Sequence, residues 1–329
     1  MAAAAASSTV ELAAIVDPIP SAAVIALKYG VPIYASLAEL FAKDKPGGVV
    51  LATPNQLHLA HAKECMDAGV PMLLEKPITV TVIEAEKLVT YQAKTNATIL
   101  IGHHRAHSPI MAKAREVIDS GKLGRLVAVM GSALFVKPDH YFDDGPWRRE
   151  IGAGPILLNM IHEIHNLRML CGEITEVQAL TSHAARGFAV EDTVAINLRF
   201  ASGVLGTFLL SDTAASAKSW EQTSQENTAY PSYDDDCYTV AGTHGSLSIP
   251  TMRMKSYAKD EDRSWWKPFD VSVVELQRSD PIAHQMEHFG KVVRGETKPL
   301  VSAFDGMQNL LITEAIVHSA KTGQVIQTG

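Results

Sequence analysis

An excess of positive charge is absent from this sequence of 329 residues, which has 29 lysines and arginines against 36 aspartates and glutamates and a net charge of −7. A chain without a basic surface does not favour nucleic acid or an anionic membrane as a partner. No apolar run approaches the about 20 residues of a membrane span, and the first residues lack the basic segment of a secretory signal. We therefore expect a cytoplasmic protein that acts on a small molecule.

Cysteine is also scarce. The three cysteines, Cys65, Cys171 and Cys237, show neither a C-x-x-C metal spacing nor the pattern of a disulfide framework. We expect them to be buried thiols in a reducing compartment. With 47% hydrophobic and 20% charged residues, the composition is typical of a globular protein, and the length allows two domains.

The first third of the chain alternates short apolar runs with helix-period segments, which is typical of parallel βα units. These patterns predict strands over 12–16, 48–52, 72–74 and 98–101, and helices over 21–28, 37–42, 61–68, 82–93 and 112–120. A turn at 121–124 predicts a boundary between a Rossmann-like domain over 1–122 and a second domain over 123–329. The second domain combines predicted strands over 126–129, 177–180, 194–200, 204–210 and 238–241 with helices over 155–170, 282–293 and 304–320. We expect it to be an α+β domain with an open, mostly antiparallel sheet.

Glycine is missing where a dinucleotide-binding domain needs it. A G-x-G-x-x-G loop follows the first strand of such domains, about 20 residues before an acid that binds the adenosine ribose. Asp17 lies at a predicted strand end, yet none of the sixteen residues before it is glycine. The segment 152–157 matches the loop only in part, because it ends in leucine and follows no predicted strand. With Asp17 as the ribose ligand, the absence of a cation in Pro18-Ile19 favours NAD over NADP; alternatively, Asp17 only caps a turn.

Lys76 follows a predicted strand and stands between Glu75 and Pro77. Its ammonium can donate to a substrate hydroxyl, or relay a proton if desolvation lowers its pKa. A surface turn is the alternative interpretation of these three residues. Cationic clusters at 103–105 and 147–149 can hold a carboxylate or a polyol near the site, or form solvated faces.

A predicted helix carries Asn159, His162 and His165 at intervals of three residues, which places neighbouring members on a shared face. A histidine of near-neutral pKa is a suitable base for removing a hydroxyl proton. Zinc-binding helices have the pattern H-E-x-x-H, whereas residues 162–165 are H-E-I-H, so we expect no metal. A histidine buried in the core is the alternative for either position.

Four segments of the chain occur in a distinctive order and spacing: Ala52-Thr53-Pro54-Asn55 with His58, Glu75-Lys76-Pro77, Gly102-His103-His104-Arg105, and the helix from Gly154 to His162. Together they resemble the glucose–fructose oxidoreductase / inositol dehydrogenase / MocA family over nearly the whole chain. The resemblance implies a Rossmann domain followed by an open-sheet domain that often forms an oligomer interface. It also implies NAD(P)-dependent oxidation of a secondary hydroxyl, or the reverse reduction, on a cyclic polyol, sugar or dihydrodiol.

The predicted site combines the motif residues with this resemblance. Lys76 and His162 match the family's proton-handling lysine and histidine, with Asn159 beside them. The predicted cofactor contacts are Asp17, Thr53, Pro54, Asn55, His58 and Glu75. The predicted substrate contacts are His104, Arg105, Arg148 and His165.

The sequence departs from the family pattern at three places. The likeness begins at the family's second strand, so the first strand and the glycine loop have no counterpart. Leu158 and His165 occupy positions where many members have aspartate. These departures leave two alternatives open: a lyase, isomerase or hydrolase that uses Lys76 and His162 without a cofactor, and a non-catalytic scaffold. We also expect residues 1–10 or a neighbouring strand to cover the sheet edge that a missing first strand exposes.

Overall fold

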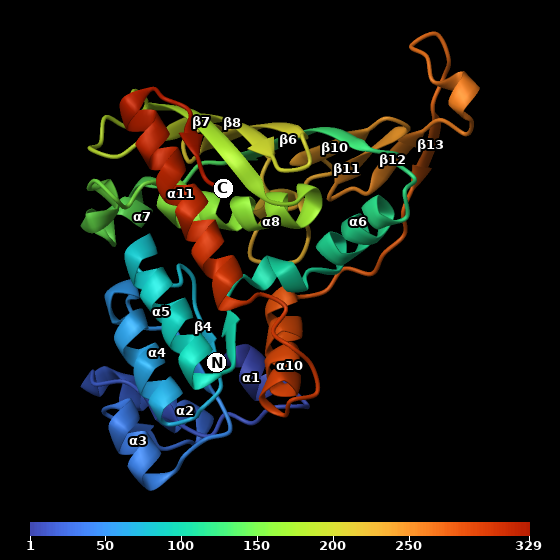
Figure 1. The fold of residues 1–329 in the computed structure, drawn as a ribbon. Helices are drawn as coiled ribbons and strands as arrows, with labels where there is room; N and C mark the ends of the chain where they lie inside the picture. The colour runs from blue at the N-terminus through green and yellow to red at the C-terminus, as the bar shows by residue number, and fades with distance from the viewer. The chain divides into compact units, whose positions relative to one another are not determined.

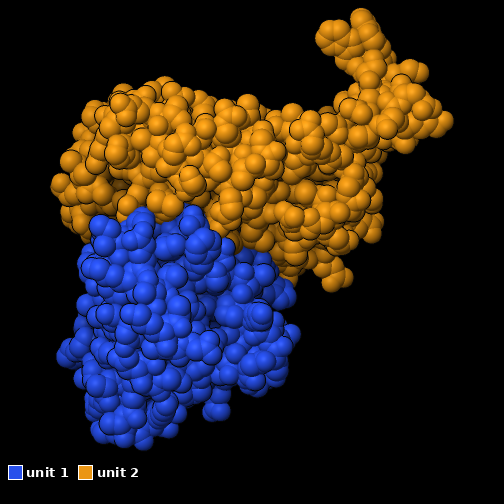
Figure 2. Space-filling model, viewed as in Figure 1, with its two compact units in different colours: residues 1–107, 281–310 blue, residues 108–280, 311–329 orange.

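The computed structural model describes residues 1–329, which form two compact units (Figure 2). Unit 1 contains residues 1–107 and 281–310, and unit 2 contains residues 108–280 and 311–329. The segment 281–310 therefore belongs to the first unit although it follows most of the second in the chain. The domain division after residue 122 stays a prediction, because compactness does not define which segments fold independently.

Unit 1 contains five short parallel strands in two separate sheets. The strands are β1 (Ile15–Val16), β2 (Ile33–Tyr34), β3 (Val49–Leu51), β4 (Met72–Leu74) and β5 (Ile99–Ile101). β1 pairs with β2, and β3, β4 and β5 form a second sheet in that order. Every residue of β4 and β5 is buried, as the uninterrupted apolar runs predicted. The parallel βα architecture expected from the sequence is confirmed.

The helices of unit 1 lie between and after these strands. They are α1 (Ala2–Ala6), α2 (Ala23–Tyr29), α3 (Leu37–Lys43), α4 (His58–Asp67), α5 (Val82–Thr95) and α10 (Pro281–Val293). Local sequence explains their ends: the Ser36 hydroxyl accepts the N–H of Glu39 at the start of α3, and Gly30 ends α2 with a φ of 67°.

No strand joins β1 to β3. Ala2–Ala6 form helix α1, which contacts α10 (Figure 1), and no neighbouring strand moves into the gap. That residues 1–10 cover this edge in another form stays a prediction. Arg294 also donates to the carbonyl oxygen of Thr9 at 3.0 Å. A run of alanines has the highest helix propensity and no β-branched side chain, so it favours helix over strand.

Unit 2 is built on a nine-stranded sheet with the order β13-β12-β11-β10-β6-β9-β8-β7-β14. The strands are β6 (Leu126–Leu134), β7 (Ile174–Ser182), β8 (Thr193–Phe200), β9 (Leu205–Ser211), β10 (Tyr238–Gly242), β11 (Gly245–Ile249), β12 (Arg253–Ser256), β13 (Asp270–Val273) and β14 (Ile326–Gln327). Only β6 and β9 pair in parallel, so the sheet is mostly antiparallel, as expected.

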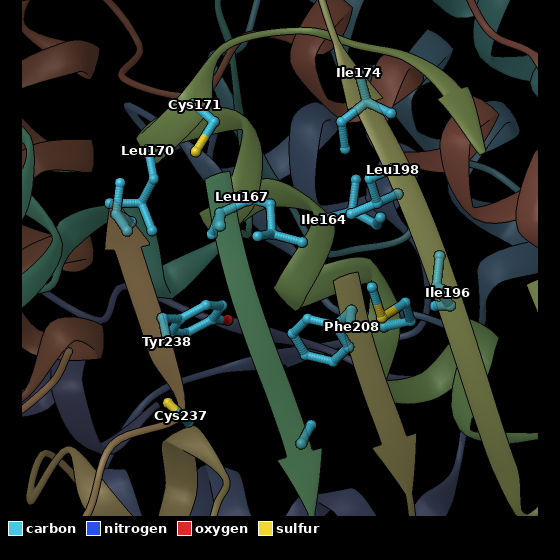
Figure 3. Close-up of a cluster of buried hydrophobic side chains, with 14 of the residues drawn as sticks. Ile164, Leu167, Leu170, Cys171, Ile174, Ile196, Leu198, Phe208, Cys237 and Tyr238 are labelled. Atoms are coloured by element: carbon cyan, nitrogen blue, oxygen red, sulfur yellow. The ribbon is translucent and has the colours of Figure 1, made fainter. Parts of the chain in front are cut away.

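The helices of unit 2 cover one face of this sheet. They are α6 (Pro109–Asp119), α7 (Asp139–Asp143), α8 (Ile161–Cys171), α9 (Trp220–Thr223) and α11 (Ala303–Thr322), which belongs to unit 2 from residue 311 onward. Figure 3 shows Ile164, Leu167 and Leu170 of α8 lying over the strands that carry Phe208 and Tyr238. Burial of these side chains and of the rest of the same core cluster stabilises the unit. No helix in the structure combines the length and the apolarity that crossing a membrane requires.

The opposite face of the sheet is open. Along β8, Val194, Ile196 and Leu198 are buried, whereas the intervening residues are exposed. Leu180 of β7 and Met130 of β6, which β8 and β9 separate on the same open face, are 72% and 63% exposed. The expected homo-oligomer interface on this face stays a prediction. All three cysteines are buried free thiols, as predicted, and burial raises the pKa of Cys65 and Cys171 to about 12.

Candidate functional site

The strands β3, β4 and β5 end at one edge of their sheet, because they are parallel and Leu51, Leu74 and Ile101 are aligned in register. The predicted segments 53–55, 75–77 and 102–105 directly follow these strand ends. Loops at the carboxyl edge of an open parallel sheet are the usual ligand-binding loops of this architecture. The structure therefore brings these three predicted segments together.

His58 links two of the three loops. The ring is fully buried, with Nε2 2.9 Å from the carbonyl oxygen of Thr53 and Nδ1 2.8 Å from that of Pro77. In either tautomer, one ring N–H donates to one of these carbonyls. These contacts position the loops, and the predicted contact of His58 with a cofactor stays a prediction.

Glu75 and Lys76 lie at the end of β4, and the peptide bond from Lys76 to Pro77 is cis. The Glu75 carboxylate accepts the backbone N–H of Lys76 at 3.3 Å, and burial raises the pKa of Glu75. Gly102 packs so closely that a Cβ there would lie 2.8 Å from the Glu75 carboxyl group and 2.9 Å from its Cα. Close packing of this kind leaves no room for a side chain at position 102 and fixes the backbone next to Lys76.

The loop after β5 places its histidines in different surroundings. His103 is buried, and its Nε2 accepts a hydrogen bond from the Asn309 amide at 3.0 Å, which assigns the ring proton to Nδ1. Burial, together with the charges of Arg105 and Lys76, lowers the pKa of His104 to about 3. Lys76, His104 and Arg105 are therefore near enough to interact, and His104 is a neutral ring at physiological pH.

The lowered pKa of His104 predicts a pH-dependent stability. Below about pH 6.5 the unfolded chain binds a proton at His104 that the folded chain does not bind until about pH 3, so this histidine destabilises the fold as the pH falls through that range. Between about pH 7.5 and about pH 5, the free energy of unfolding is expected to fall in both proteins. The fall should be about 1–2 kcal/mol smaller in His104→Gln than in the wild type. Urea unfolding at both values measures this. The exposed His183 supplies the control, His183→Gln, and equal losses in wild type and His104→Gln would contradict the prediction.

Asp17 follows β1, on the separate two-stranded sheet. Its Oδ1 accepts the N–H of Ile19 at 2.8 Å, which is the contact of a turn cap. The turn alternative thus describes the observed geometry, and the ribose contact stays a prediction.

In unit 2, the predicted helix begins as a π-helical turn over Ile156–Met160 and continues as α8. Asn159 lies in the π turn and His162 in the first turn of α8, and both are half-buried. A π turn is rare and occurs frequently at functional sites. His165 is only 6% exposed, which is the environment expected for a core histidine, and its predicted substrate contact stays a prediction.

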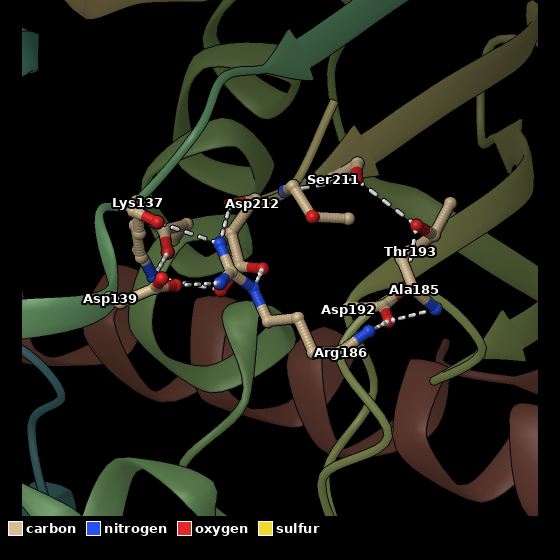
Figure 4. Close-up of polar contacts among 10 residues, drawn as sticks. Lys137, Asp139, Ala185, Arg186, Asp192, Thr193, Ser211 and Asp212 are labelled. Atoms are coloured by element: carbon tan, nitrogen blue, oxygen red, sulfur yellow. Dashed lines mark hydrogen bonds and ion pairs between the residues drawn. The ribbon is translucent and has the colours of Figure 1, made fainter. Parts of the chain in front are cut away.

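Lys137 is a functional candidate that the sequence analysis missed. It follows β6, and its Nζ donates to Asn159 Oδ1 at 2.8 Å and lies 3.5 Å from Asp212 Oδ2. Arg186 Nε donates to the other oxygen of Asp212 at 3.1 Å (Figure 4). Lys137 follows a strand, which is the same signal that identified the loops of unit 1. The sequence analysis missed it because it predicted that this strand ends at residue 129 rather than at Leu134.

Arg148 and Lys137 approach the same aromatic ring. The Arg148 Cζ is 4.0 Å and the Lys137 Nζ is 5.1 Å from the centre of the Tyr141 ring. Arg148 also donates to the carbonyl oxygen of Tyr141 at 2.5 Å. Cation–π contacts of this kind hold both side chains at the Tyr141 ring, and Lys137 also contacts the half-buried Asn159. Lys76 belongs to unit 1 and His162 to unit 2, so their action as a pair stays a prediction.

Comparison with known proteins identifies the family. Residues 1–103 match the model of an oxidoreductase family with an NAD-binding Rossmann fold, and residues 111–248 match the GFO/IDH/MocA C-terminal domain. The chain belongs to the Gfo/Idh/MocA oxidoreductase family. The resemblance predicted from the motifs is therefore confirmed, and the members of this family are NAD(P)-dependent oxidoreductases of the sugar and polyol dehydrogenase type.

Among Gfo/Idh/MocA relatives, the rhizopine catabolism protein MocA of Rhizobium meliloti is 28% identical over 321 residues, covering 95% of this chain and 88% of the relative. The 1,5-anhydro-D-fructose reductase of Ensifer adhaerens is 26% identical over 299 residues, covering 89% and 84%. A solved structure of an oxidoreductase from Agrobacterium radiobacter, in complex with NAD+, L-tartaric acid and magnesium, has a TM-score of 0.81 at 19% identity and covers 100% of this chain and 94% of that one. The last similarity shows the fold.

The cofactor of the Gfo/Idh/MocA family fits this chain in part. The strand-end residues 53–55 and 75–76 place polar groups at the carboxyl edge of the sheet, and their contact with the nicotinamide half stays a prediction. Residues 1–16 contain no glycine, and the first described glycine, Gly30, ends α2 rather than beginning a helix. The pyrophosphate cradle of a glycine-rich loop before a helix is therefore not formed by the residues ahead of β1.

Proposed function

We propose that this chain oxidises a secondary hydroxyl of a cyclic polyol, sugar or dihydrodiol, or reduces the corresponding carbonyl, with NAD as the favoured nicotinamide cofactor. The observation that carries the proposal is the position of Lys76 at the carboxyl edge of β3–β5, next to a buried Glu75 and a closely packed Gly102. Relatives named as 1,5-anhydro-D-fructose reductase and inositol 2-dehydrogenase support this substrate class. Asp17, followed by the uncharged Pro18-Ile19, supports NAD over NADP.

In this proposal the two proton-handling groups act on the substrate oxygen. The Lys76 ammonium donates a hydrogen bond to that oxygen, and the His162 imidazole takes the hydroxyl proton. Asn159, His104, Arg105 and Arg148 orient the substrate. The nicotinamide, when bound, supplies the hydride acceptor.

Two measurements test the proposal together. We expect calorimetric titration with NAD or NADH to give measurable heat, and the nucleotide to raise the melting temperature as a ligand of the folded state does. We also expect a panel of cyclic polyols, sugars and dihydrodiols to reduce NAD faster than NADP. Absence of binding to both nucleotides, or turnover of a substrate without any added nucleotide, would refute the proposal. The second result would favour cofactor-independent acid–base chemistry at the same residues.

A further inference from the structure

We propose that Lys137, together with Asn159 and Arg148, binds the carboxylate of an acidic substrate, such as a sugar acid or a cyclic hydroxy acid. The inference rests on the proposed function, because it narrows the substrate class of the same site. All of the residues that carry it lie in unit 2.

Lys137 is held in place from several sides. Its side chain is 12% exposed, and its backbone N–H donates to the carbonyl oxygen of Asp212 at 2.8 Å. An ammonium group has three N–H donors. One is directed at Asn159 Oδ1 and one at Asp212, while the described contacts give the third no acceptor oxygen and leave it near the Tyr141 ring. This third donor is available to a ligand.

The carboxylate paired with Lys137 is already in use, although the charge of Glu221 also acts on this lysine. Both carboxylate oxygens of Asp212 are occupied, one by Lys137 and one by Arg186, whose guanidinium also donates to the carbonyl oxygens of Lys137 and Asp212. The loop that carries Arg186 is fixed in turn, because the buried Asp192 accepts the N–H groups of Ala185 and Arg186 at 2.9 Å each (Figure 4). Asp212 cannot turn toward a ligand without releasing a buried cation.

Asn159 and Arg148 have donors to which the described contacts give no acceptor. Because Asn159 Oδ1 accepts from Lys137, the amide N–H groups of Asn159 are directed elsewhere, and no other contact engages them. Arg148 Nε is buried without a hydrogen-bond partner. Glu191, a half-buried residue whose pKa the charge of Lys137 also affects, accepts the N–H of Ile156 at 3.0 Å. Burial disfavours the charged carboxylate of Glu191 and so raises its pKa.

The chemistry of the ligand follows from this surplus of donors. A hydroxyl group brings a proton of its own, which needs an acceptor, and both oxygens of Asp212 are already engaged. A carboxylate brings only acceptors, and its hydrogen bonds to ammonium and guanidinium groups are charge-assisted. Burial lowers the pKa of Lys137 while Asp212 raises it, so a bound carboxylate would stabilise the charged ammonium further.

The test compares matched neutral and acidic substrates, D-galactose with D-galacturonate and D-glucose with D-glucuronate, in this chain with added NAD. The variants are Lys137→Met and Lys137→Arg, and the control is Lys218→Met, which removes an exposed lysine paired with Asp235 at 2.7 Å. For the acid of at least one pair, Lys137→Met is expected to raise KM about 10- to 100-fold with a smaller change in kcat. For the neutral sugar of the pair, Lys137→Met should change KM less than about 3-fold. Lys137→Arg should retain part of the affinity for the acid, and Lys218→Met should give the wild-type KM for both substrates.

Calorimetric titration of the acids without nucleotide separates this inference from the proposed function. The inference is supported if the wild type binds an acid and Lys137→Met does not, even when no substrate reduces NAD. A failure of every substrate to reduce NAD would refute only the proposed function. Turnover in which the acid and neutral substrates lose equally, or in which neither loses, would refute the inference alone. An absence of acid binding to the wild type would also refute it. Near-ultraviolet circular dichroism of each variant checks that the fold is retained.

Discussion

Lys76→Met is expected to lower kcat about 10²- to 10⁴-fold on any substrate that the wild type oxidises, because it removes the donor proposed for the reacting oxygen. His162→Asn is expected to give a loss of similar size, since the asparagine amide cannot take up the hydroxyl proton. The double variant should lose much less than the product of the two single losses, because groups that act in one step are not additive. Initial rates of NADH formation under saturating substrate measure all three.

Matched variants separate this prediction from an effect on folding or cofactor binding. Lys87→Met removes an exposed lysine from α5 in the same unit, and it should keep the wild-type rate. The heat of NAD binding should change little in Lys76→Met, since methionine has a similar volume and the lysine is assigned to the substrate oxygen. A kcat within about 3-fold of the wild type in both single variants would exclude the proposed roles.

Asp212→Ala is expected to destabilise unit 2 by about 3–5 kcal/mol, the cost of leaving a buried charge without its partner. Asp212 is 4% exposed and is the shared counter-ion of Lys137 and Arg186, whose side chains are 12% and 9% exposed. Urea unfolding followed by tryptophan fluorescence and circular dichroism measures the loss. Asp235→Ala breaks the exposed pair with Lys218 and should cost less than about 1 kcal/mol.

A double variant distinguishes charge from packing at Asp212. If the loss comes from an unpaired cation, Lys137→Met combined with Asp212→Ala should be less destabilised than the sum of the two single variants. If the losses in the free energy of unfolding are additive, or if Asp212→Ala loses less than about 1 kcal/mol, water solvates the two cations and the prediction is wrong.

The elements that sequence alone predicted are those in which local and tertiary preferences agree. The apolar runs at 72–74 and 98–101 became the buried strands β4 and β5, and the helix predicted over 37–42 became α3, which Ser36 caps. The strand-end loops of unit 1 followed from the same pattern, because parallel strands place their carboxyl ends together.

Lys137 shows why part of the site could not be predicted. The run from Met130 to Leu134 contains glycine, serine and alanine, which have weak strand propensity. This segment is a strand because β9 and β10 pair with it on either side, from parts of the chain about 75 and 110 residues away. Without that pairing, Lys137 has no recognisable place after a strand. Its partners, Asp212 and Arg186, are equally remote in sequence.

The absence of a strand between β1 and β3 has a consequence for local opening and hydrogen exchange. The ladder of β1 and β2 comprises only two residue pairs, Ile15 with Ile33 and Val16 with Tyr34, whereas β4 is buried and bonded on both sides. Amide protons of β1 are therefore expected to exchange through a local opening of low free energy. Those of β4 are expected to exchange only through a larger opening of higher free energy. Asp17 stands on the labile ladder and Lys76 on the protected one. If a nucleotide binds Asp17, the ordering of the β1–β2 ladder offsets part of its binding free energy. Its binding should therefore slow amide exchange at β1 before it changes exchange at β4.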